Sequence, residues 1–203
     1  MKRLKVCVML SAALCILSFT DTWAESATVA SSAYGKIVFC RQKNSVTNEW
    51  NVYTMNRDGS GETALTSGFQ DRMPHFNPQG TKIVFSRITG PQSSICVMNS
   101  DGSGVTSITS DPSLGGMKMS PRFSSDGSKV VFDRQAGPNS TEIWTVNTDG
   151  TDPVRIVPGT YDNRGASFSP DGQWVVYSRY LSPTTAKVCK ARVSDGAVTE
   201  LTD

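Results

Sequence analysis

The segment FSPDGQWVVYSR, residues 168–179, contains the pattern that decides the fold. A Ser-Pro-Asp-Gly turn separates Phe168 from a short run of aromatic and β-branched residues, and Arg179 closes that run. Asp-Gly between short apolar runs is typical of tight hairpins, because glycine adopts a positive φ without steric cost. The segment therefore predicts two antiparallel strands joined by a tight turn.

The same pattern recurs along the chain. The apolar run is KIVFCR ending at Arg41, KIVFSR at Arg87, KVVFDR at Arg134 and WVVYSR at Arg179, in steps of 46, 47 and 45 residues. Related turn segments precede three of these runs (PHFNPQG, PRFSSDG and ASFSPDG), and a second Asp-Gly turn follows each run. Three elements that keep one period predict repeat units of four strands each, which is the period of a β-propeller blade.

Together with IWTVNTDG, residues 143–150, the opening segment resembles the WD-like repeat of the TolB family of periplasmic propeller proteins. The resemblance covers residues 35–203 and implies an all-β propeller of four-stranded antiparallel blades. About four blades are countable in this chain, at about 35–67, 68–110, 111–157 and 158–203. The resemblance instead implies six blades and a preceding α/β domain for members of the TolB family. The first unit has no recognisable first strand unless ATVAS, residues 27–31, supplies it. A small four-bladed ring is favoured over an open arc completed by another chain or a truncated product.

The N-terminus has the layout of a secretory signal. Lys2, Arg3 and Lys5 precede a short apolar run, and Thr22 and Ala24 give a small-x-small cleavage site. We expect a signal peptide at 1–24, a short segment at 25–34, and a periplasmic or secreted protein that is not inserted in the membrane. Cleavage changes the net charge from +2 to zero, which disfavours nucleic-acid binding.

Catalytic, cofactor and metal sites are not expected. The sequence lacks a G-x-S-x-G nucleophile elbow and a glycine-rich phosphate loop, and its one histidine, His75, is interpreted as structural. The stretch NSDGSG, starting at Asn99, resembles the start of a calcium loop, but its twelfth position is Ser110 and strands flank it. It is interpreted as a hairpin turn. The three cysteines of the mature chain, Cys40, Cys96 and Cys189, are interpreted as buried thiols on strands.

The variable loops between the second and third strands of each unit, and between consecutive units, form the candidate binding face. The repeated arginines Arg41, Arg87, Arg134 and Arg179 enter this face. They could ring an acidic ligand, or each could tie its loop to a carbonyl or to an aspartate of an adjoining loop, with Asp71 and Asp162 as the expected acceptors. Arg72, Tyr161 and Arg164 do not repeat strictly and are the candidates for specific contact.

The leading hypothesis is an exported, non-catalytic binding module that recognises an envelope or periplasmic protein, possibly of the Tol–Pal type, and that could form a homo-oligomer to complete the propeller. The alternatives are a propeller domain associated with a hydrolase or polysaccharide lyase activity, and a truncated propeller fragment.

Overall fold

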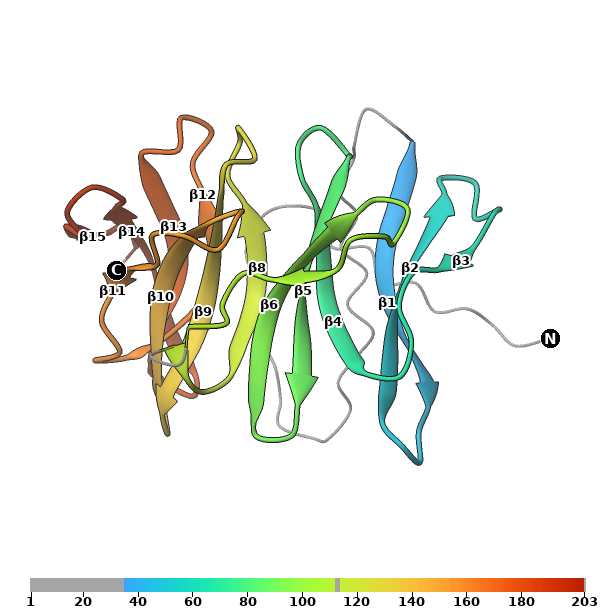
Figure 1. The fold of residues 1–203 in the computed structure, drawn as a ribbon. Coiled ribbons are helices and arrows are strands. Elements are labelled where there is room, and N and C mark those ends of the chain that lie inside the picture. Colours follow the sequence, from blue (N-terminus) through green and yellow to red (C-terminus); the bar gives the residue numbers. More distant parts are fainter. Residues whose placement is uncertain (1–34, 112–113, 203) are drawn as a thin grey trace.

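A computed structural model describes residues 35–111 and 114–202. These residues form strands and turns, which confirms the all-β class (Figure 1). Antiparallel pairing divides the strands into four consecutive groups, called groups 1 to 4. Group 1 contains β1 (Lys36–Asn44), β2 (Glu49–Asn56) and β3 (Thr63–Ala64), and group 2 contains β4 (Gln70–Phe76), β5 (Lys82–Thr89), β6 (Gln92–Asn99) and β7 (Thr106–Ser107). Group 3 contains β8 (Lys118–Phe123), β9 (Lys129–Gly137), β10 (Ser140–Asn147) and β11 (Val154–Val157). Group 4 contains β12 (Asp162–Phe168), β13 (Trp174–Ser182), β14 (Thr185–Arg192) and β15 (Val198–Glu200).

Two parallel contacts join the groups in pairs, which produces two mixed sheets. Trp50 of β2 pairs with Gln70 of β4, so groups 1 and 2 form a seven-stranded sheet. Thr141 of β10 pairs with Asp162 of β12, so groups 3 and 4 form an eight-stranded sheet.

The strands of the middle groups are apolar on both faces because each middle group lies between two others. Val84 and Phe85 are adjacent on β5 and therefore point to opposite faces, yet both are 0% exposed. Burial on both faces explains why β5 and β9 read as continuous apolar runs rather than as alternating patterns.

The groups contact one another in chain order. Strands β1 and β2 contact β4, strands β5 and β6 contact β8, and strands β9 and β10 contact β12. Within the described residues, no strand of group 1 makes an extensive contact with a strand of group 4, and the two groups lie at opposite ends of the row in Figure 1. The closed ring favoured from the sequence is therefore not formed by these residues, and the arrangement is open.

The Asp-Gly segments are hairpin turns, as the sequence predicts. In the turn after β6, Asp101 Oδ1 accepts hydrogen bonds from the backbone N (2.9 Å) and the hydroxyl (2.6 Å) of Ser103. Asn99 Nδ2 donates to Ser103 Oγ (2.9 Å), and Gly102 has a φ of 90°. These bonds also lower the pKa of Asp101. The side chains of this turn are thus occupied in closing the hairpin.

The three cysteines are buried on β1, β6 and β14, which confirms their interpretation. The described part of the chain contains no helix long and apolar enough to cross a membrane. The expected signal peptide at 1–24, the segment at 25–34 and the candidate strand at 27–31 lie outside the described residues.

Candidate functional site

The connections expected to form a binding face do lie together at one end of the groups. The β1–β2, β5–β6 and β9–β10 connections lie along the lower edge of the molecule in Figure 1. Backbone hydrogen bonds fix the connections between groups beside them: Trp50 N donates to Phe69 O (3.0 Å), and Thr141 N donates to Tyr161 O (3.0 Å). We call this end of the molecule the loop face, and the end that carries the Asp-Gly turns the turn face.

Each of the four repeated arginines is engaged by a carboxylate. Arg87 makes two 2.8 Å contacts with Asp71, which is itself 0% exposed. The other three pairs are Arg41–Glu62 (2.6 Å), Arg134–Glu142 (2.6 Å) and Arg179–Glu200 (3.4 Å). The expected acceptor role of Asp71 is confirmed, whereas that of Asp162 is wrong, because Asp162 pairs with Arg164 (2.8 Å) instead.

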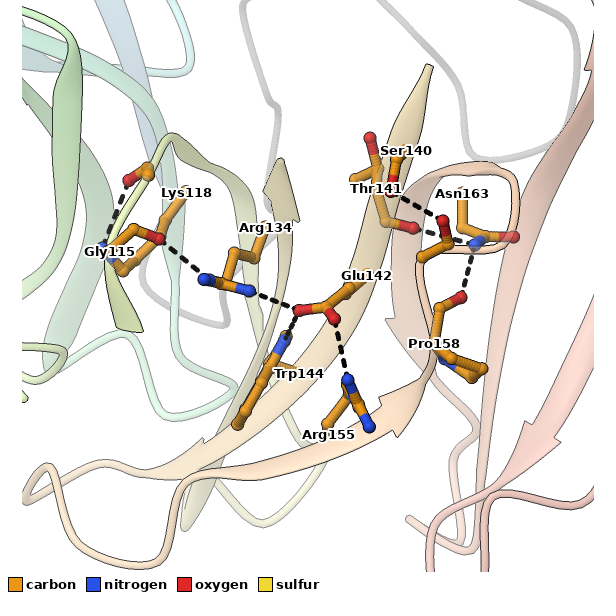
Figure 2. A network of polar contacts seen from close by, with 12 residues as sticks. Gly115, Lys118, Arg134, Ser140, Thr141, Glu142, Trp144, Arg155, Pro158 and Asn163 are labelled. Carbon is orange, nitrogen blue, oxygen red and sulfur yellow. Dashed lines mark hydrogen bonds and ion pairs between the residues drawn. The ribbon is translucent and has the colours of Figure 1, made fainter. Parts of the chain in front are cut away.

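Glu142 is the centre of the largest of these networks, which Figure 2 shows. Its carboxylate accepts hydrogen bonds from Arg134 Nη1 (2.6 Å), Trp144 Nε1 (2.7 Å) and Arg155 Nη1 (3.0 Å). Burial opposes ionisation of Glu142, but these three donors outweigh it and lower the pKa of the carboxyl group. The repeated arginine of group 3 is thereby fixed within the protein.

Asn163 orders the connection that follows this network. Its Nδ2 donates to the carbonyl oxygens of Thr141 (2.8 Å) and Pro158 (3.3 Å), which are labelled in Figure 2, and to that of Tyr161 (3.1 Å). Asn163 is 0% exposed, so one buried amide holds the segment that presents Tyr161 on the loop face.

Two exposed aromatic rings stand at equivalent positions on the loop face. Phe69 precedes β4 and Tyr161 precedes β12, and each carbonyl accepts the bond from the neighbouring group described above. Their exposed fractions are 44% and 40%. The guanidinium of Arg87 lies 4.1 Å from the Phe69 ring centroid, and that of Arg179 lies 5.0 Å from the Tyr161 ring centroid.

Arg72 and Arg164 complete the two positions. Each follows its exposed ring by three residues and stacks on a further aromatic ring: Arg72 on Trp50 at 4.3 Å, and Arg164 on Tyr180 at 5.8 Å. We call Phe69, Arg72 and Arg87 the first aromatic–arginine patch, and Tyr161, Arg164 and Arg179 the second.

The sequence prediction assigned five of the six patch residues to the loop face but missed Phe69. It treated Arg72 and Arg164 as non-repeating, because group 3 has Gly116 and Met119 at the positions of the aromatic ring and the arginine. The shared spacing of Phe69–Arg72 and Tyr161–Arg164 is the signal that would have identified Phe69.

The first patch adjoins a depression of about 370 Å³. This depression is lined by Phe69, Thr47, Glu49, Gly68 and Gln70.

A second polar region lies along the strands β4, β8, β9 and β12. Asp133 is 4% exposed and accepts hydrogen bonds from Gly165 N (3.0 Å) and Ala166 N (3.4 Å). Burial raises the pKa of Asp133 to about 6 despite these bonds. Burial, with a contribution from the Arg122 charge, lowers the pKa of His75 to about 4.

His75 has the structural environment expected from the sequence. Its Nδ1 lies 2.7 Å from the Phe76 carbonyl oxygen. In the described ranges 35–111 and 114–202, no group of three or more His, Cys, Asp and Glu side chains is placed to hold a metal ion.

Solved structures of several other proteins have a fold similar to that of this chain. TolB from Acinetobacter baumannii matches with a TM-score of 0.66 and 21% identity over 83% of this chain. The fold is similar to that of β-propeller proteins. A putative TolB from Agrobacterium tumefaciens matches with a TM-score of 0.69 and 20% identity over 82% of this chain, and this chain spans 41% and 60% of the two TolB chains, respectively.

The propeller-like fold is shared with enzymes as well. An oligogalacturonate lyase from Vibrio parahaemolyticus matches with a TM-score of 0.62 and 12% identity over 83% of this chain and 51% of its own. Prolyl endopeptidases and the tricorn protease also share the fold. No protein-family model and no curated protein sequence matches this chain.

Proposed function

We propose that this chain is a non-catalytic binding module of the bacterial envelope, built from four TolB-like propeller repeats, and that it recognises an envelope protein through its loop face. The two aromatic–arginine patches carry this proposal. In the proposal the protein is exported to the periplasm or beyond after loss of the signal peptide, and each strand group is one blade.

The chemistry of the patches suits protein recognition. Aromatic rings and arginines are enriched at the centres of protein interfaces, where they account for much of the binding energy. Here Arg87 and Arg179 hold the exposed rings of Phe69 and Tyr161 by stacking, so the rings are ordered before a partner arrives. Ordered side chains lose less conformational entropy on binding.

The partner is expected to be acidic at its contact points. Each patch combines an arginine stacked on the exposed ring with a second arginine, Arg72 or Arg164, that is stacked on another ring, and Arg164 is 58% exposed in its side chain. A carboxylate-bearing segment with an apolar residue would satisfy both kinds of group.

Charge reversal at both patches tests the proposal. The Arg72→Glu/Arg164→Glu double variant and the wild type are used to capture partners from an envelope extract, and the Kd of each purified partner is then measured by calorimetry. We expect binding at least about tenfold weaker, which corresponds to ~1.4 kcal/mol.

The matched control reverses two charges on the turn face. Arg57 lies in the turn after β2 and Lys82 begins β5, so the Arg57→Glu/Lys82→Glu variant changes the net charge equally. Unchanged affinity in this control is expected. Equal affinity of all three proteins for every specific partner would refute the role of the loop face.

A hydrolase or lyase association is the second candidate function, favoured by the fold shared with prolyl endopeptidases and with the oligogalacturonate lyase. A screen with peptide and polygalacturonate substrates addresses it. Turnover that disappears in His75→Ala would support catalysis over the binding role.

A further inference from the structure

The first strands of groups 2, 3 and 4 lie side by side, with β8 in contact with both β4 and β12. We call these three the inner strands. Each has a register shift that includes one residue in the left-handed conformation: Met73 (φ 55°), Ser120 (φ 54°) and Gly165 (φ 68°). Residues other than glycine rarely adopt this conformation, and those that do are concentrated at functional sites.

Two arginines on the inner strands have no carboxylate partner. Arg72 and Arg122 form no salt bridge with any described residue, whereas the four repeated arginines all do. Arg122 Nη1 donates only to the adjacent Pro121 carbonyl oxygen (2.9 Å), and burial lowers the pKa of Arg122. Arg72 Nη2 donates to Asn48 Oδ1 (3.3 Å), but Arg72 Nε is buried without a hydrogen-bond partner among the described residues. A partly buried charge without a counter-ion is unfavourable, so an incoming anion would stabilise both guanidinium groups.

Arg164 adds a third guanidinium group to this surface. Arg72 on β4 and Arg164 on β12 occupy equivalent positions near the loop face, and Met119 occupies that position on β8. Arg122 follows Met119 by three residues and therefore lies nearer the turn face. The Arg164 side chain is 58% exposed although it pairs with Asp162. Each inner strand thus contributes one guanidinium group.

The carboxylates of this region are engaged by other groups. Asp133 is 4% exposed and accepts hydrogen bonds from two backbone N–H groups of β12 (3.0 and 3.4 Å), and Asp162 pairs with Arg164 (2.8 Å). The Asp133 charge favours the ionised form of Arg122, but the two groups form no salt bridge. His75, the counterpart of Arg122 on β4, is neutral near pH 7, because burial and the Arg122 charge lower its pKa to about 4. The arginines therefore outnumber the carboxylates on this surface.

Two methionines make the same surface partly apolar. Met73 and Met119 are partly exposed, and Met73 Sδ lies 3.3 Å from Ser120 N, which joins β4 to β8. Flexible thioether side chains adapt to the apolar side chains of many peptides. An acidic polysaccharide has carboxylates but no apolar side chains, so arginines beside methionines favour a peptide.

We propose that the inner strands bind an acidic peptide segment of the partner, in which Arg122 binds one carboxylate and Arg72 or Arg164 binds another. Arginine suits this role because its planar guanidinium group can donate two parallel hydrogen bonds to one carboxylate. The inference rests on the proposed recognition of a protein, and it extends the contact from the loop face along the inner strands. It gives Arg122 a binding role that the two aromatic–arginine patches do not include.

The test uses a fluorescein-labelled peptide of alternating glutamate and leucine, which is titrated with the purified mature chain and followed by fluorescence anisotropy. Arg122→Gln is expected to weaken binding at least about tenfold, because it removes charge-assisted hydrogen bonds to a carboxylate. Arg192→Gln is the matched control. It removes the same charge from an arginine that already pairs with Asp195 (3.0 Å), so its affinity for the peptide should be unchanged.

Ser167 provides variants that leave the three arginines in place. It is exposed, and it is the counterpart of Arg122 on β12. Ser167→Glu is expected to weaken peptide binding and Ser167→Lys to strengthen it, each by at least about threefold, through the added charge. These two variants decide the outcome if Arg122→Gln does not fold, as judged by circular dichroism.

No binding of the peptide by the wild type, or equal affinity of the wild type, Arg122→Gln and Ser167→Glu, would overturn the inference. Equal binding of a peptide with glutamine in place of glutamate, or tighter binding of an oligogalacturonate, would also overturn it. A captured envelope partner separates this inference from the proposed function. If Arg72→Glu/Arg164→Glu loses that partner while Arg122→Gln and Ser167→Glu keep it, only the inner-strand contact is wrong; if no variant changes its affinity, the proposed function fails.

Discussion

At the scale of single residues, Asp133 and His75 have opposite effects on stability over the same pH range. The pKa of Asp133 is raised from 3.8 to about 6 in the folded protein, so the fold favours its protonated form and stability falls as the pH rises from about 4 to 6. The pKa of His75 is lowered from 6.5 to about 4, so the fold favours its neutral form and stability rises over nearly the same interval. In the wild type the two effects offset each other.

The Asp133→Asn variant is expected to expose the effect of His75. Its free energy of unfolding should rise by roughly 3 kcal/mol between pH 4 and pH 6.5, since one pKa unit corresponds to ~1.4 kcal/mol. The absolute stability should also fall, because the asparagine amide cannot accept from both Gly165 N and Ala166 N as the carboxylate does. Urea unfolding at several pH values gives both quantities.

His75→Gln is the matching variant with the opposite sign. Its free energy of unfolding should fall as the pH rises from about 4 to 6, because His75 no longer offsets the Asp133 effect. The aspartates of the turns do not obscure this range: hydrogen bonds lower the pKa of Asp126 to about 2, so its contribution is lost only at more acidic pH. Parallel profiles for the wild type and both variants would contradict this account.

At the scale of strands and turns, the sequence predicted the class, the repeat and the turn positions, because each depends on local pattern. The apolar runs ending at Arg41, Arg87, Arg134 and Arg179 lie on β1, β5, β9 and β13. The stacking of Arg87 on Phe69 could not be predicted from local pattern, because it joins β5 to a residue that precedes β4. The difference between Phe39 and Phe85 was also hidden: the two share one sequence context and differ only in what packs against them.

The two identical turns of groups 1 and 2 provide a prediction at this scale. Both read Asn-x-Asp-Gly-Ser-Gly, with Gly59 at a φ of 82° and Gly102 at 90°. Alanine at either glycine is expected to cost about 1–2 kcal/mol for the left-handed backbone. Gly102→Ala should cost at least about 1 kcal/mol more, because its Cβ would lie 3.1 Å from Leu65 O.

Gly59 serves as the internal control, because a Cβ built on it would have no atom within 4 Å. Urea unfolding of the two alanine variants gives the difference directly. Equal losses would mean that the turn of group 2 is not held against Leu65.

At the scale of the whole molecule, the protein is a row of groups in which each packs only on its neighbours, so local stability depends on how many neighbours a group has. Among the described residues, groups 2 and 3 have two neighbouring groups each, and groups 1 and 4 have one. Amide hydrogen exchange should therefore be slowest on β5 and β9 and faster on β1 and β14. Exchange measured by mass spectrometry tests this expectation: protection of β1 and β14 equal to that of β5 and β9 would contradict it.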